Sequence, residues 1–87
     1  MPRVFLPASL REQAGGEAVI ELPGSSLREV LAALEEKWPG VVARLIVGDQ
    51  LRPGWGVSIG GRMVREGLRA KLASTDEVHF IPAVGGG

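Results

Sequence analysis

Apolar and polar residues alternate in several short segments of this chain, which predicts strands with one buried face. Residues 3–6 are short and rich in strand-forming types, and Pro7, which cannot donate to a strand ladder, ends them. In the segment 17–22 every second residue is apolar, and the same alternation returns in 55–59 and 77–81. A period of two predicts strands that turn one face to a core and the other to water.

The segment after residue 25 has a different period and predicts a helix. Ser26 and Glu29 have the spacing of a capping box, in which a hydroxyl and a carboxylate satisfy amides of the first helical turn. Apolar residues then recur at helical spacing, at Leu27, Val30, Leu31, Leu34 and Trp38. Pro39 and Gly40 end the pattern. We expect one amphipathic helix packed across one face of the sheet.

The remaining segments connect these elements. Gly60 and Gly61 have the composition of a two-residue hairpin turn, and 62–64 is the expected returning strand. Residues 41–47 are compatible with a helical turn or a strand. Loops or loose turns are expected at 8–14, 48–50, 52–54 and 65–73, the last anchored by Leu68 and Leu72.

The order of elements is strand, strand, helix, strand, strand, strand. Two hairpins flanking one helix predict an α+β fold of the β-grasp (ubiquitin-like) type, with a mixed sheet of four to five strands and one main helix across it. We expect the folded domain to span residues 1–82 and a flexible glycine-rich tail to span 83–87.

Composition narrows the functional classes. Ten basic and ten acidic residues cancel, so the long-range field that supports nucleic-acid binding is missing. Without cysteine and with one histidine, His79, the chain offers no thiol nucleophile, no evident metal site and no set of catalytic residues. No apolar stretch resembles a signal peptide or a membrane span. We therefore expect a cytoplasmic protein that is not itself an enzyme.

The glycine-rich tail suggests a different kind of chemistry. Six residues from Pro82 to Gly87 span roughly 20 Å when extended. Glycines without Cβ atoms pass through a narrow channel and adopt any φ. Such a tail can present an α-carboxylate inside the active site of another protein. The plainer alternative is that these glycines are disordered filler, as many termini are.

With these features in place, the sequence resembles the MoaD/ThiS family of ubiquitin-like sulfur carriers over essentially its whole length. The resemblance lies in Pro23-Gly24-Ser25-Ser26-Leu27, in Lys37-Trp38-Pro39-Gly40, in the segment 72–78, and above all in the ending Ile81-Pro82-Ala83-Val84-Gly85-Gly86-Gly87. Thr75 and Gly85 depart from the usual residues of such proteins, but the terminal Gly86-Gly87 pair does not.

The resemblance implies a mechanism that runs through partners. A ubiquitin-activating-type enzyme would use ATP and magnesium to adenylate the carboxylate of Gly87, and sulfur would then displace AMP to leave a thiocarboxylate. Gly86, Gly85 and Val84 would occupy the channel of the activating enzyme. A synthase subunit would then accept the sulfur. The chain itself would bind no cofactor.

The resemblance also places partner contacts at Ile81, Met63 and Pro82. In the last strand Val78 and Phe80 should face the core, which leaves Ile81 apolar where a water-exposed residue is expected. The alternative is that Ile81 and Met63 are ordinary half-buried aliphatic residues. A basic rim formed by Arg11, Arg62, Arg65 and Arg69 is a further possibility, and a solvated surface is the simpler one.

Three functions remain open on the sequence. The first is a sulfur carrier of the molybdopterin or cysteine type. The second is a protein modifier joined to lysines through Gly87, which shares the tail chemistry up to the adenylate. The third is a plain interaction module with an inert tail.

Overall fold

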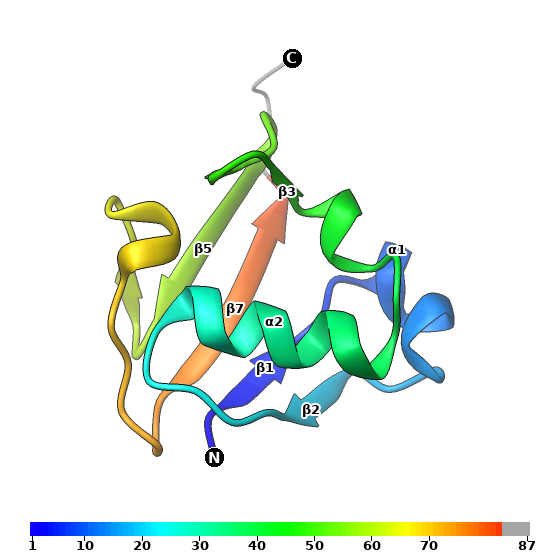
Figure 1. Ribbon diagram of the computed structural model, residues 1–87, viewed down its shortest axis with the longest axis horizontal. Coiled ribbons are helices and arrows are strands. Elements are labelled where there is room, and N and C mark those ends of the chain that lie inside the picture. Colours follow the sequence, from blue (N-terminus) through cyan, green and yellow to red (C-terminus); the bar gives the residue numbers. More distant parts are fainter. Residues whose placement is uncertain (83–87) are drawn as a thin grey trace.

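A computed structural model describes residues 1–82 of the chain and shows a mixed five-stranded sheet. The strands are β1 (Arg3–Phe5), β2 (Val19–Glu21), β5 (Trp55–Ile59), β6 (Arg62–Met63) and β7 (Glu77–Pro82). Their order is β2-β1-β7-β5-β6, and the central pair β1–β7 is parallel while the other pairs are antiparallel (Figure 1). The sheet therefore has the β-grasp arrangement that the sequence predicts.

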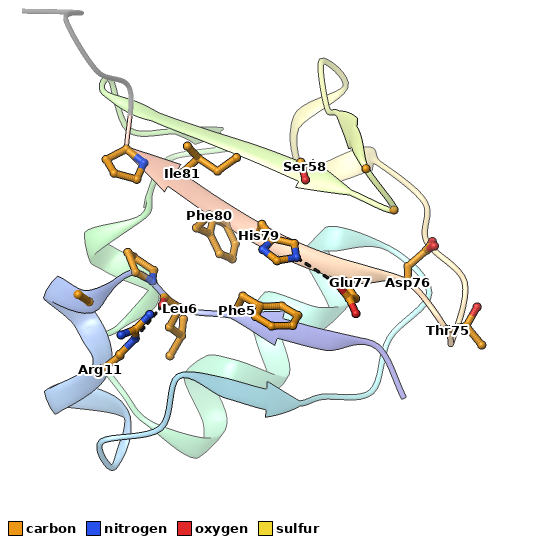
Figure 2. Close-up of a pocket in the computed structure, with 15 residues that line it drawn as sticks. Phe5, Leu6, Arg11, Ser58, Thr75, Asp76, Glu77, His79, Phe80 and Ile81 are labelled. Atoms are coloured by element: carbon orange, nitrogen blue, oxygen red, sulfur yellow. Dashed lines mark hydrogen bonds and ion pairs between the residues drawn. The ribbon is translucent and has the colours of Figure 1, made fainter.

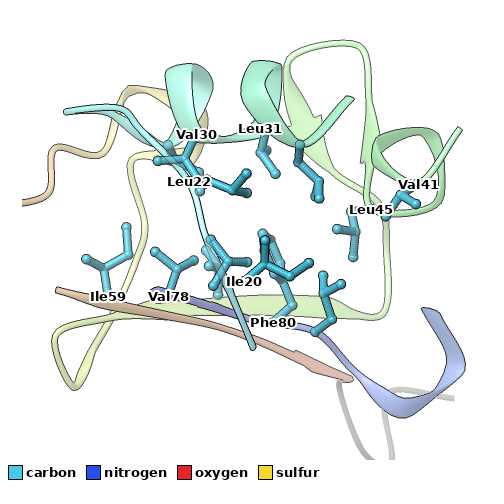
Figure 3. Close-up of a cluster of buried hydrophobic side chains, with 14 of the residues drawn as sticks. Ile20, Leu22, Val30, Leu31, Val41, Leu45, Ile59, Val78 and Phe80 are labelled. Atoms are coloured by element: carbon cyan, nitrogen blue, oxygen red, sulfur yellow. The ribbon is translucent and has the colours of Figure 1, made fainter. Parts of the chain in front are cut away.

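One long helix, α2 (Leu27–Lys37), crosses one face of this sheet (Figure 1). Its buried residues are Leu27, Val30, Leu31 and Leu34, which are the first four members of the predicted stripe. Figure 3 shows Val30 and Leu31 pointing from the helix towards Val78 and Phe80 of the sheet. Within residues 1–82 no polar or charged side chain is buried, so the hydrophobic effect dominates the core.

The start of α2 differs in one detail from the predicted capping box. The amide of Glu29 donates to the hydroxyl of Ser26 at 3.2 Å, as predicted. The carboxylate of Glu29, however, accepts from the amide of Ser25 at 2.9 Å, one residue earlier than a capping box requires. This bond from the Ser25 amide lowers the pKa of Glu29.

Removing the cap tests this assignment. We expect Ser26→Ala to lower the free energy of unfolding by about 1 kcal/mol, because one amide of the first turn loses its partner. Chemical denaturation measures the loss. Ser9→Ala, at an exposed serine whose side chain caps no helix, is the control and should change little. Equal stability of Ser26→Ala and wild type would contradict the capping role.

Two connecting segments are more ordered than the sequence predicts. The predicted loop 8–14 is wrong, since it forms a short helix α1 (Ala8–Arg11) and a 3-10 turn η1 (Glu12–Ala14). Leu10 and Ala14, four residues apart, bury themselves in the core and hold this segment in place. The predicted loop 48–50 is wrong at Gln50, which begins β4 (Gln50–Leu51), and this strand pairs with β3 (Ile46–Val47) in a separate two-stranded sheet.

The other connections agree with the patterns. Residues 41–47 contain both predicted alternatives, a 3-10 turn η2 (Val42–Arg44) followed by β3. Gly60 and Gly61 turn the β5–β6 hairpin with φ of 59° and 84°, conformations that favour glycine. The connection after β6 contains the 3-10 turn η3 (Gly67–Arg69), and Leu68 and Leu72 anchor it in the core.

Candidate functional site

The sheet face opposite α2 has no helix of the described residues packed over it and carries a row of side chains from all five strands. The strand register places Val19, Phe5, His79, Ser58 and Met63 side by side across β2, β1, β7, β5 and β6. Ile81 and Gly56 form a second pair on the same face, nearer the end of β7. We call these seven residues the outer face.

Exposed apolar residues gather on this outer face. Five large apolar side chains are conspicuously exposed within residues 1–82, and three of them, Val19, Met63 and Ile81, lie here. Met63 is 53% exposed and Ile81 42%. The prediction that Ile81 points away from the core while Val78 and Phe80 point into it is confirmed. Val19 lies at one edge of this face and Met63 at the other, and Ile81 lies on β7 between them. Exposed apolar residues on an uncovered sheet face are candidates for contact with another protein.

Interactions with neighbouring residues hold the ring of His79 in the middle of the outer face. The imidazole stacks on the ring of Phe5 with centroids 4.1 Å apart and planes 8° from parallel. Its Nε2 lies 3.3 Å from Glu77 Oε1, while Glu77 Oε2 pairs with the guanidinium of Arg3 at 2.7 Å. The Phe5–His79 stack therefore adds a flat aromatic platform between the two apolar edges.

A groove runs along the same face between β7 and the segment that joins β1 to α1 (Figure 2). Asp76 and Glu77 lie towards one end of it, and Ile81 and Pro82 lie towards the other. On the side of the α1 segment, Arg11 donates from Nε to the backbone oxygen of Leu6 at 3.1 Å. This bond holds a positive charge beside the groove.

The predicted site residues divide into two groups. Ile81 and Met63 lie on the outer face, and Pro82 is the exposed last residue of β7 opposite Trp55. Val84, Gly85, Gly86 and Gly87 lie outside the described residues, as does the rest of the predicted tail 83–87. Their roles stay predictions.

Sequence reasoning named only Ile81 and Met63 among the outer-face residues as partner contacts and missed the other five, which are Val19, Phe5, Gly56, Ser58 and His79. The alternation within β5 contained the signal for Gly56, since it is out of phase with Trp55 and Val57. Phe5 gave no comparable signal, because its contact with His79 depends on the parallel pairing of β1 and β7, two strands far apart in the sequence.

The four arginines considered for a basic rim do not come together. Arg62 forms two hydrogen bonds to the carboxylate of Glu66, at 3.2 and 3.0 Å, and these lower the pKa of Glu66 to about 2. Arg65 and Arg69 line a different hollow, beside Arg28. Arg11 lies beside the outer-face groove. Arg11 therefore lies at a different hollow from Arg65 and Arg69, so the structure does not support one rim of all four arginines, and a solvated surface remains the simpler interpretation.

Nowhere in residues 1–82 do three or more histidine, cysteine, aspartate or glutamate side chains gather closely enough to hold a metal ion. The helices within this range are all too short or too polar to cross a membrane.

Comparison with known proteins agrees with the fold. Residues 4–87 match the ThiS family. The sulfur carrier protein CysO of Mycobacterium tuberculosis is 32% identical to this chain, with 97% of this chain and 96% of the relative covered. CysO in the BexX/CysO complex of Amycolatopsis orientalis superposes with a TM-score of 0.91 at 31% identity and full coverage of both chains.

A further solved relative carries a different name. The small archaeal modifier protein 1 of Methanosarcina acetivorans superposes with a TM-score of 0.77 at 33% identity, covering 99% of this chain and 95% of the relative. The TM-scores show that both kinds of relative share the overall fold of this chain. This chain belongs to the ThiS family of ubiquitin-like β-grasp proteins.

Proposed function

We propose that this protein is a sulfur carrier that acts through a thiocarboxylate on Gly87. The observation that carries this proposal is its near full-length similarity to the sulfur carrier CysO. The exposed apolar outer face beside Pro82 supports it, since a carrier must dock before its tail reaches a partner's active site. These relatives favour the cysteine branch over the molybdopterin branch that the sequence also allowed.

The proposed chemistry has two steps, and both involve the α-carboxyl group of Gly87. In the first, a carboxylate oxygen of Gly87 attacks the α-phosphorus of ATP, and pyrophosphate leaves with its magnesium ion. In the second, a sulfur nucleophile attacks the acyl carbon and AMP leaves; where that nucleophile is a persulfide, a second thiol then cleaves the sulfur–sulfur bond. A free carboxylate is a poor acyl donor, so the adenylate divides one difficult step into two easier ones.

The partners supply the catalysis in this scheme. A ubiquitin-activating-type enzyme holds ATP and magnesium, and a synthase subunit receives the sulfur. The carrier contributes the tail, its reach and the outer face, and tethering the sulfur raises its effective concentration at the acceptor. The BexX/CysO complex shows that a CysO protein assembles with another protein, which supports a docking role for this surface.

Intact-mass spectrometry of the chain purified from its own cells tests this function. Exchange of one oxygen for sulfur at Gly87 should raise the mass by about 16 Da. A chain that lacks Gly86 and Gly87 is the control and should show no gain. A native chain that never carries the extra mass, even when purified together with its partners, would contradict the proposal.

A second function has specific support from the archaeal modifier protein among the structural relatives. A modifier would form an isopeptide bond between Gly87 and a lysine of a target. Immunoblots from the same cells distinguish the two functions. A ladder of heavier species that disappears when Gly87 is removed indicates conjugation, whereas the gain in mass of the free chain indicates sulfur transfer.

A further inference from the structure

Gly56 is unlike every other glycine within residues 1–82. Nine of the ten glycines there have a positive φ, which explains by itself why a glycine is needed at those positions. Gly56 is the exception, since it lies inside β5 with an ordinary strand backbone that any residue can adopt. Backbone conformation therefore does not explain a glycine at this position, and the remaining explanation is the lack of room for a Cβ atom.

The space above Gly56 is filled by Met63. A Cβ atom placed on Gly56 would lie 3.1 Å from the terminal methyl carbon of Met63, closer than such contacts normally are, and 3.8 Å from the backbone oxygen of Ile81. Met63 pairs with Ser58, two residues further along β5, so its side chain reaches diagonally across the strand. The end of this side chain thus lies between β6 and the part of β7 that carries Ile81.

Folding stability does not account for this arrangement. A glycine inside a strand costs conformational entropy and leaves no side chain to pack. Packing of Met63 against Gly56 offsets little of this loss of stability, because the Met63 side chain remains 53% exposed. Gly56 therefore makes the outer face flatter at some expense to the stability of β5.

We propose that Gly56 is a positioning residue for docking: it lets Met63 lie across β5 and join Ile81 in one continuous apolar surface beside Pro82. The occupant is the activating partner of the proposed function, on which this inference rests, and it contacts the surface with an apolar side chain. Continuity with the end of β7 argues for this occupant, since the same partner must receive the tail that follows Pro82. The flexible thioether of Met63 suits such a contact, because methionine adapts its shape to an irregular neighbour.

A double-mutant cycle on Gly56 and Met63 tests the proposal. The probe is the purified ubiquitin-activating-type enzyme of the source organism, and isothermal titration calorimetry measures Kd for wild type, Gly56→Ala, Met63→Ala and the double variant. We expect Gly56→Ala to raise Kd about 5-fold, because its Cβ forces the terminal methyl of Met63 to shift from the position that it holds over β5. In the Met63→Ala background the same substitution should change nothing. Val47→Ala, at an exposed residue of the other sheet, should bind as wild type does.

Two measurements on the free chain accompany the cycle. The thermal midpoint of Gly56→Ala should equal or exceed that of wild type, because alanine suits a strand better than glycine. Proton NMR should show a cross-relaxation peak between the Met63 methyl and the α protons of Gly56. Absence of this peak would overturn the proposed contact without reference to any partner.

The binding results separate the two proposals. If wild type binds and Gly56→Ala binds equally well, or if the two substitutions weaken binding independently, the positioning role is overturned and the proposed function stands. If wild type itself does not bind the activating enzyme, the proposed function fails, and this inference fails with it.

Discussion

Converting the α-carboxylate of Gly87 to a carboxamide is expected to abolish sulfur loading of this protein. The carboxamide has the same length and shape as the carboxylate but lacks the anionic oxygen that attacks ATP, so no adenylate forms. ATP–pyrophosphate exchange catalysed by the activating enzyme measures this step. We expect the exchange rate with the carboxamide chain to fall to the rate without carrier.

A semisynthetic chain with a native carboxylate is the matched control, and it should support full exchange. Two alanines added before Met1 provide a second control, since the same length of chain at the other terminus leaves Gly87 unchanged. Two alanines added after Gly87 should instead block exchange, because they place Cβ atoms where the channel accepts glycine. Full exchange by the carboxamide chain would show that the reaction does not use this carboxylate.

Ile81→Asp is expected to weaken binding to the activating enzyme about 30-fold or more, which corresponds to about 2 kcal/mol and is the cost of losing a central apolar contact. The substitution also places a charge against an apolar partner surface, which adds a desolvation penalty. Calorimetry measures Kd, and the exchange assay at rising carrier concentration shows whether saturation restores the rate.

Val47→Asp is the matched control for this change. Val47 is 50% exposed and Ile81 is 42% exposed, so both substitutions place a carboxylate at a similarly exposed site of a strand. Val47 lies on β3, outside the five-stranded sheet, and its variant should bind as wild type does. Equal losses from both variants would indicate a general effect of charge and would contradict docking through the outer face.

The two changes separate the chemistry at Gly87 from the docking of the folded domain. The carboxamide removes chemistry without touching the folded domain, and saturating concentrations should not rescue it. The Ile81 variant keeps the chemistry and removes docking, so a high concentration of carrier should rescue it.

The sequence alone determined the class of fold and much of the site. The capped amphipathic pattern at 26–38 and the alternation in the strands each depend on neighbouring residues, so local physics sufficed to predict α2 and the exposed side of Ile81. The ending from Pro82 to Gly87 also made the resemblance to the family visible in the sequence.

Tertiary structure alone decided which distant residues meet. Residues 8–14 form helical turns because this places Leu10 and Ala14 in the core. Local helix propensity did not predict these turns. The Phe5–His79 stack exists because β1 pairs with β7, which lies more than 70 residues further along the chain. The contact of Met63 with Gly56 depends in the same way on the registers of β5 with β6 and β7. Sheet pairing joins residues whatever their separation in sequence, so a pattern read along one strand cannot show what lies beside it.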